Sequence, residues 1–277
     1  MHVLYDNCIR PIDDVNMPVS SGSFLYGLNV FEGMKLFRTL GHLLPLHMYD
    51  HLDRLELSAA AVGWKIDRNK ILDDIRMCCE YAKSDTYFRV IIFSNTSWAD
   101  TSNFETIILF HPIDAFKNQS FKCSTVNLMK GEHKTLPATI KAGANYINSR
   151  YGIIEASKSY GGYPIFIDKE GFLTETGGAA LVFEFNKSLF TYPCTGNTLD
   201  SITLKILKKL PCVNILDLPV HKTLISSVTG CIMVGTSVDI APIIKIDDYR
   251  LSNSLKIANH LTKKYKKYII ELDNETN

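Results

Sequence analysis

The chain has 277 residues, 46% of them hydrophobic and 21% charged, which suits one large globular domain or two smaller ones. Its net charge of +1 gives no global field that would attract nucleic acid or an anionic membrane. No apolar run reaches the ~18 residues of a membrane-spanning helix. We therefore expect neither nucleic acid nor a membrane as a partner.

The cysteines and histidines argue against a metal site. The chain has seven cysteines, an odd number, and they form no C-x-x-C pair and no Cys/His cluster with metal-ligand spacing. Reduced thiols in a cytoplasmic protein are the simplest interpretation. Residues 1–6 also lack the basic and apolar parts of a secretion signal.

The first part of the chain predicts a smaller α/β domain. Four runs indicate regular structure: helices over 48–62 and 71–82, and strands over 87–94 and 106–110. Pro112 and the polar run 118–120 then interrupt the pattern. We accordingly predict an N-terminal domain over 1–112 and an interdomain linker over 113–119.

The remaining residues, 120–277, predict a larger mixed domain. Its expected helices cover 145–160, 201–210 and 252–267, and its expected strands cover 163–168, 171–174, 181–185, 189–192 and 231–234. Short turns at 169–170 and 186–188 separate strands in the way β-hairpins do. Helices and strands alternate irregularly, which predicts an α+β or mixed α/β fold rather than a regular doubly wound sheet.

One segment and one later carboxylate suggest a pyridoxal phosphate (PLP) site. Lys141 is followed by the small residues 142–144 and by Tyr146, and Glu175 comes after a turn. The lysine would hold PLP as a Schiff base, the small residues would leave room for the ring, and the acid would keep a proton on the pyridine nitrogen. Because most lysines are solvated surface groups, the interpretation depends on the companion residues.

Three further features are suited to the phosphate group. Residues 201–203 (Ser-Ile-Thr) open a predicted helix, whose first N–H groups and positive dipole end bind anions. Residues 235–237 (Gly-Thr-Ser) follow an apolar run, and Arg54 can donate charge-assisted hydrogen bonds. Each has an ordinary alternative, respectively a helix cap, a turn and a surface arginine.

Seven segments, in chain order, carry a family resemblance: 26–33 (YGLNVFEG), 51–55 (HLDRL), 87–89 (YFR), 141–146 (KAGANY), 173–175 (LTE), 201–203 (SIT) and 235–237 (GTS). Together they resemble the fold-type IV PLP-dependent enzymes, specifically the branched-chain amino acid aminotransferase family. The resemblance implies a two-domain, D-amino acid aminotransferase-like architecture, with PLP in the larger domain.

The resemblance also implies roles for matching residues. Lys141 would bind the cofactor and move the substrate proton, Glu175 would hold the pyridine nitrogen, and Tyr146 would hold the phenolic oxygen. The other cofactor-binding residues would be Arg54, Ser201, Ile202, Thr203, Gly235 and Thr236. The substrate-binding residues would be Tyr26, Phe31, Tyr87, Arg89, Thr236 and Ser237, although Phe31 and Tyr87 also suit core packing.

The chain departs from the family pattern at a few positions. Ala180 stands where the family usually has an asparagine, and Ser201 stands where it usually has a glycine. Lys35 occupies a position where arginine is frequent, and Ile113 occupies one where a large aromatic residue is usual. The cofactor chemistry is therefore better specified than the substrate.

The implied activity is transfer of an amino group between an L-amino acid, branched-chain or otherwise apolar, and a 2-oxo acid such as 2-oxoglutarate, by a homodimer. Four alternatives stay open: a D-amino acid transaminase, an aminodeoxychorismate lyase, a biosynthetic aminotransferase for an unusual amino acid, and a non-catalytic binding relative.

Overall fold

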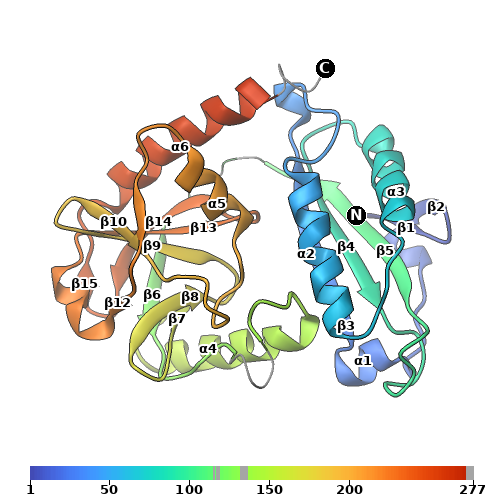
Figure 1. The fold of residues 1–277 in the computed structure, drawn as a ribbon, viewed down its shortest axis with the longest axis horizontal. Coiled ribbons are helices and arrows are strands. Elements are labelled where there is room, and N and C mark those ends of the chain that lie inside the picture. The colour runs from blue at the N-terminus through green and yellow to red at the C-terminus, as the bar shows by residue number, and fades with distance from the viewer. Residues whose placement is uncertain (115, 117–118, 132–136, 273–277) are drawn as a thin grey trace. The chain divides into compact units, whose positions relative to one another are not determined.

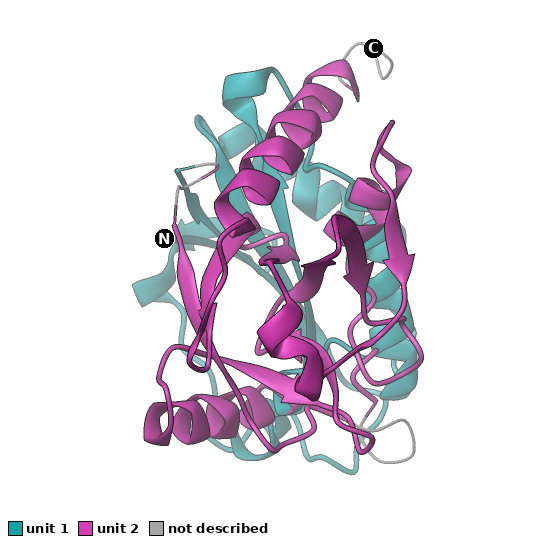
Figure 2. Ribbon diagram, turned by 90° about the vertical axis from the view of Figure 1, so that its left-hand side faces the viewer, with its two compact units in different colours: residues 1–115, 140–144 teal, residues 116–139, 145–277 magenta. Residues whose placement is uncertain are grey.

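The computed structural model describes residues 1–114, 116, 119–131 and 137–272. The chain divides into two compact units (Figure 2). Unit 1 comprises Met1–Ala115 and Ile140–Ala144, and unit 2 comprises Phe116–Thr139 and Asn145–Asn277. Unit 1 therefore includes the segment with Lys141, which the sequence assigned to the C-terminal domain. Part of the predicted linker over 113–119 lies outside the described residues, and the domain boundaries stay a prediction.

Unit 1 is built on an antiparallel five-stranded sheet (Figure 1). Its strands, in sheet order, are β2 (Cys8–Pro11), β1 (His2–Tyr5), β5 (Glu105–Pro112), β4 (Thr86–Phe93) and β3 (Asn29–Leu36). Its helices are α1 (Gly22–Tyr26), α2 (Met48–Ala61) and α3 (Arg68–Tyr81), with short 3-10 helices η1 (Ile12–Asp14) and η2 (Arg38–Leu40). Both predicted helices and both predicted strands are confirmed within a few residues.

The two faces of the unit 1 sheet differ in what they contact. Alternate residues of a strand point to opposite faces. Met34 of β3 and Phe88 of β4 pack with Leu52 and Leu55 of α2 in the main core of the unit. Phe31, Gly33 and Lys35 alternate with these core positions, so they lie on the opposite face. The strand pairing places Tyr87 and Arg89 beside them.

Unit 2 contains a ten-stranded sheet that closes on itself. Its strands, in sheet order, are β11 (Ile215–Asp217), β10 (Ser188–Thr191), β9 (Ala180–Phe185), β13 (Gly230–Gly235), β14 (Asp239–Ile246), β6 (Phe121–Thr125), β7 (Tyr163–Ile167), β8 (Phe172–Thr176) and β12 (Val220–His221), and β15 (Tyr249–Arg250) pairs with β14. Because β8 also pairs with β9, the strands between them form a closed ring. The predicted hairpins, β7–β8 and β9–β10, are confirmed.

Three α-helices of unit 2 and the 3-10 helix η4 lie against this sheet (Figure 1). They are α4 (Tyr146–Lys158), α5 (Ile202–Lys209), α6 (Ser254–Leu272) and η4 (Lys222–Ser227). The 3-10 helix η3 (Gly143–Asn145), whose first two residues belong to unit 1, precedes α4 in the chain. The prediction that the last helix ends at residue 267 is wrong. Tyr265 and Ile269 continue the buried stripe of Ala258 and Leu261 at helical spacing, so packing extends the helix through the basic run. Within the described helices, none is long and apolar enough to cross a membrane.

Candidate active site

Lys141 lies on a short segment that is tied to the edge of the unit 1 sheet. Ala142 forms an isolated antiparallel bridge with Val30 of β3, and the Lys141 carbonyl accepts the N–H of Phe31 at 3.0 Å. The Lys141 N–H donates to Ser58 Oγ of α2 at 3.1 Å. With its backbone fixed on both sides, the side chain places Nζ 5.0 Å from the centroid of the Phe31 ring.

Arg54 is held by a buried carboxylate. Glu32, which is 0% exposed, accepts from Arg54 Nε at 2.6 Å and from Nη2 at 2.8 Å, while His51 Nδ1 lies 2.7 Å from its Oε2. Burial opposes ionisation of Glu32, but the Arg54 charge and the hydrogen bonds from Arg54 and His51 outweigh it and lower the pKa of Glu32 to about 2. Burial also lowers the pKa of His51, so a neutral imidazole donates Nδ1–H to the carboxylate.

The predicted substrate residues of unit 1 fall into two groups. Phe31, Tyr87 and Arg89 lie on one sheet face, with the Arg89 guanidinium 4.7 Å from the centroid of the Phe31 ring. Tyr87 lies across Gly33, since a Cβ atom built on that glycine would lie 2.0 Å from Tyr87 Oη. Tyr26, at the end of α1, forms the second group and is 59% exposed.

Glu175 is the buried acid of unit 2. It lies on β8, is 2% exposed, and its Oε1 accepts from Lys130 Nζ at 3.2 Å and from the Leu199 N–H at 3.3 Å. The Leu199 contact comes from the loop that leads into α5. The structure therefore joins Glu175 directly to the residues that precede the predicted phosphate site.

Tyr146 begins α4, and this helix contacts the turn that follows Glu175. One turn further along α4, Ser149 Oγ donates to the Gly177 carbonyl at 2.8 Å. Lys130 Nζ also lies 5.8 Å from the centroid of the Tyr146 ring. The Lys130 ammonium group thus lies near both Tyr146 and Glu175. The family resemblance implies that Tyr146 contacts the phenolic oxygen of PLP and that Glu175 contacts its pyridine nitrogen.

The predicted phosphate-binding residues of unit 2 occupy a helix start and a strand end. Ser201 caps α5 and its Oγ accepts the Leu204 N–H, while Ile202 and Thr203 form the first turn and are buried. In the sheet, Glu175 pairs with Ala180, which pairs with Val234 next to Gly235. The turn with Thr236 and Ser237 follows at once, closed by a hydrogen bond from the Val238 N–H to the Gly235 carbonyl.

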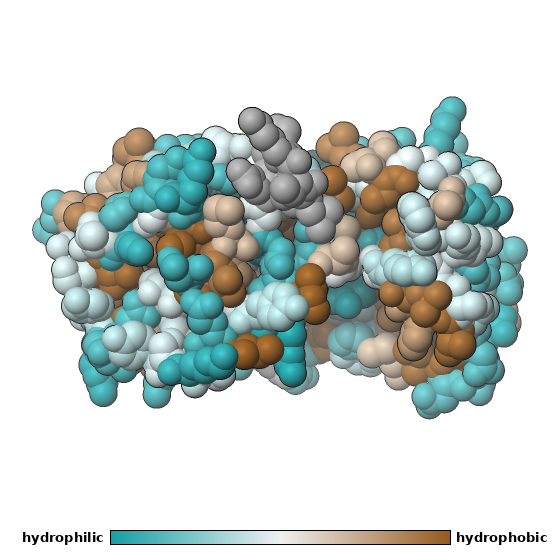
Figure 3. All heavy atoms as spheres, turned by 90° about the horizontal axis from the view of Figure 1, so that it is seen from below, coloured by the Kyte–Doolittle hydropathy of each residue, from teal (hydrophilic) through white to brown (hydrophobic). Residues whose placement is uncertain are grey.

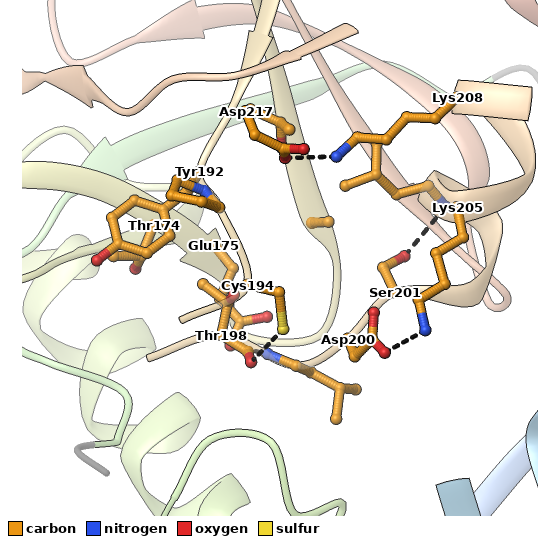
Figure 4. A pocket seen from close by; sticks show the side chains of 15 residues that line it. Thr174, Glu175, Tyr192, Cys194, Thr198, Asp200, Ser201, Lys205, Lys208 and Asp217 are labelled. Atoms are coloured by element: carbon orange, nitrogen blue, oxygen red, sulfur yellow. Dashed lines mark hydrogen bonds and ion pairs between the residues drawn. The ribbon is translucent and has the colours of Figure 1, made fainter. Parts of the chain in front are cut away.

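A cavity of about 380 Å³ adjoins this part of unit 2 (Figure 4). Figure 4 shows Glu175 on one side and Ser201, at the start of α5, on the other. Two ion pairs, Lys205–Asp200 and Lys208–Asp217, lie along its wall. Of the predicted cofactor residues only Glu175 and Ser201 line this cavity, so it covers one part of the predicted site.

Sequence reasoning missed Glu32, His51 and Lys130. Glu32 and His51 lie within segments that carry the family resemblance, and their spacing alone did not show that they meet Arg54. Lys130 lies in a loop without a motif, 45 residues from its partner Glu175 in numbering, so only the folded chain brings them together.

The family model for class IV amino-transferases matches residues 29–246, and this chain belongs to that family. It is an aminotransferase. The branched-chain-amino-acid aminotransferase of Escherichia coli K12 is 23% identical over 254 residues, which cover 85% of this chain and 81% of the relative.

Solved structures of the same kind share the fold. The branched-chain aminotransferase from Thermoproteus uzoniensis with norvaline has a TM-score of 0.85 at 22% identity, covering 98% of this chain and 95% of that one. The branched-chain amino acid aminotransferase from Thermobaculum terrenum in its PLP form has a TM-score of 0.85 at 20% identity, covering 98% and 94%. The predicted fold-type IV architecture is confirmed.

Proposed function

We propose that this enzyme uses PLP to transfer an amino group between an L-amino acid with a branched-chain or other apolar side chain and a 2-oxo acid, with 2-oxoglutarate as the first candidate. Relatives named as branched-chain aminotransferases, and a structural neighbour in its PLP form, support this proposal.

The observation that carries the proposal is the setting of Glu175. A carboxylate that is 2% exposed, faced by an ammonium group and a backbone N–H, is suited to accept a hydrogen bond from a protonated pyridine nitrogen. In the same unit, the α5 N-terminus offers the N–H groups and dipole that favour a phosphate. The donors and acceptors of unit 2 therefore fit a pyridine ring that carries a phosphate.

Unit 1 supplies the amine and a guanidinium. We assign covalent attachment of PLP to Lys141, whose backbone is fixed to β3 and α2. We assign phosphate binding to Arg54, which Glu32 and His51 hold in place. A rigid arginine loses less conformational entropy when it binds an anion.

Bound PLP supplies an electron sink that weakens the bonds to the substrate Cα. With PLP bound, Lys141 would serve as the base that takes up and moves the proton released from the substrate Cα. Glu175 would keep the proton on the pyridine nitrogen. Tyr146 would donate to the phenolic oxygen, and Thr236 and Ser237 would contribute near the substrate carboxylate.

The substrate preference rests on the face formed by Phe31, Tyr87 and Arg89. Aromatic rings form an apolar wall for an aliphatic side chain, and an arginine can pair with a second carboxylate such as that of 2-oxoglutarate. We assign Tyr26 to the same pocket.

The assembly and its location extend the proposal. Exposed apolar side chains include Phe24 and Leu25 on α1 and Ile147 and Tyr151 on α4, and apolar groups stand among polar ones on the face seen in Figure 3. We propose a homodimer, because such exposed groups favour association. Free thiols support a cytoplasmic location. Light scattering that gives the mass of a single 31.2 kDa chain would contradict the dimer.

The test is an activity panel on the purified protein. L-leucine, L-isoleucine and L-valine are offered with 2-oxoglutarate, and glutamate is measured. Lys141→Ala should lower turnover by at least ~1,000-fold, because it removes the covalent catalyst and base. Lys263→Ala, at an exposed position of α6, is the matched control and should leave turnover unchanged.

Two results would contradict the proposal. One is a protein that does not bind PLP. The other is a PLP-bound protein that forms no glutamate from any L-amino acid. Reaction with D-amino acids, or release of pyruvate from aminodeoxychorismate, would instead support the alternative activities of the fold.

A further inference from the structure

Lys130 is a buried lysine to which the proposed mechanism gives no role. It follows β6 in unit 2 and is 6% exposed. Its Nζ lies 3.2 Å from Oε1 of Glu175, itself 2% exposed. Lysine is rarely buried without a partner, because removing an ammonium group from water costs much free energy. Glu175 is the partner that compensates for the burial of the Lys130 ammonium group.

A hydrogen bond to α4 also holds the backbone of Lys130. Its carbonyl accepts from Asn148 Nδ2 at 2.7 Å, in the first turn of α4. Its ammonium group lies 5.8 Å from the ring centroid of Tyr146, the first residue of the same helix. Lys130 thus connects the start of α4 to Glu175 on β8.

Charge is the second contribution of this lysine. Burial disfavours the charged form of a carboxyl group, and a cation within hydrogen-bond distance restores it. If Glu175 were protonated, it would carry no negative charge to stabilise a pyridinium cation, and the pyridine nitrogen would lose its proton. A neutral pyridine is a weaker electron sink.

We propose that Lys130 is a positioning residue that keeps Glu175 ionised and oriented, so that Glu175 can hold a protonated pyridine nitrogen. This inference rests on the proposed PLP function. Lys130 acts through Glu175 and touches neither the amino acid nor the 2-oxo acid.

A structural role alone would have a different signature. Buried ion pairs contribute little net stability compared with apolar residues of similar volume, and removing one partner mainly destabilises the fold. A structural Lys130 would therefore alter unfolding but leave the protonation of the bound cofactor unchanged. A positioning Lys130 alters that protonation.

The experiment compares four variants: Lys130→Met, Lys130→Arg, Glu175→Gln, and the double variant Lys130→Met/Glu175→Gln. PLP affinity is measured by titration of the apoprotein. The ¹⁵N chemical shift of PLP labelled at the pyridine nitrogen reports whether that nitrogen is protonated. Lys267→Met, which removes an exposed ion pair on α6, is the control and should stay within about twofold of the wild type in PLP affinity.

We expect Lys130→Met to weaken PLP binding by roughly tenfold to a hundredfold, the range for loss of a charged hydrogen bond. Its ¹⁵N shift should move toward the neutral pyridine value. Lys130→Arg should retain the protonated signal. In the Glu175→Gln background, adding Lys130→Met should change affinity by less than about threefold, because the lysine then has no carboxylate to act on.

Three results would overturn the inference. The first is an unchanged ¹⁵N shift and affinity in Lys130→Met while the wild type binds PLP, which leaves the proposed function intact. The second is a large further loss of PLP affinity when Lys130→Met is added to Glu175→Gln. This result is informative even if the Lys130→Met single variant does not fold. The third is a wild-type protein that does not bind PLP, which ends the proposed function as well.

Discussion

Replacing Glu32 by glutamine should destabilise unit 1 strongly. The carboxylate is 0% exposed and is the counter-ion of Arg54, whose side chain is only 11% exposed. Glutamine keeps the shape of the side chain but removes its charge. The Arg54 guanidinium would then remain largely buried without the carboxylate that accepts hydrogen bonds from its Nε and Nη2 atoms.

The magnitude follows from the carboxyl pKa. Lowering it from 4.5 to about 2 corresponds to about 3 kcal/mol of stability at neutral pH, at about 1.4 kcal/mol per pKa unit. Loss of one partner of a buried ion pair costs about 3 to 5 kcal/mol in other proteins. We therefore expect Glu32→Gln to lower the free energy of unfolding by about 3 kcal/mol.

The assay can isolate unit 1, because both tryptophans of the chain, Trp64 and Trp98, lie within it. Tryptophan fluorescence during urea unfolding at pH 7 follows this unit. Glu56→Gln is the matched control: it lies on α2, as Arg54 does, and its ion pair with Arg68 is exposed, so we expect a change below ~0.5 kcal/mol. A Glu32→Gln effect as small as that of the control would refute the account of a buried, ionised Glu32.

Three more predictions concern acid stability and two local contacts. Because folding lowers the pKa of Glu32, its contribution to the free energy of unfolding is complete above pH 4.5 and is lost as pH falls toward 2. Wild-type stability should therefore fall more steeply than that of Glu32→Gln in this window. If urea unfolding showed the same pH dependence for both proteins, this prediction would be contradicted. Gly33→Ala should raise KM and lower the free energy of unfolding by at least ~1 kcal/mol, because the new Cβ clashes with Tyr87 Oη. Adding Tyr87→Phe should recover part of the lost stability. No recovery would show that the steric clash involves other atoms. Ser201→Ala should cost ~1 kcal/mol through loss of the α5 cap, whereas Ser201→Gly should cost only a few tenths, and equal effects in thermal unfolding would argue against capping.

The elements that the sequence predicted well are those defined by local patterns. The apolar spacing of Leu52, Leu55 and Ala59 identified α2, and short polar turns identified the hairpins. The start of α3 was placed three residues late, because Asp67 caps the helix and allows polar residues to form its first turn.

Long-range pairing was not readable in the same way. The parallel pairing of β6 with β7 and β14, and the contact of β8 with β9 that closes the ring, join segments without a local signal. The segment with Lys141 is a further example, since its bridge to Val30 assigns it to unit 1.

The candidate site shows the same division. Motifs pointed to Lys141, Glu175 and Arg54, because their residue types suit the chemistry. Their partners Glu32 and Lys130 could not be read from spacing, because a buried charge selects its counter-ion in three dimensions.

The central claim is that Lys141 carries the cofactor, and one measurement tests it most directly. Borohydride reduction of the PLP-bound protein, followed by peptide mass spectrometry, identifies the lysine that bears the pyridoxyl group. We predict modification of Lys141, with Lys130 unmodified. A pyridoxyl group on Lys130 or any other lysine, with Lys141 intact, would contradict the assignment of the amine and with it the proposed site.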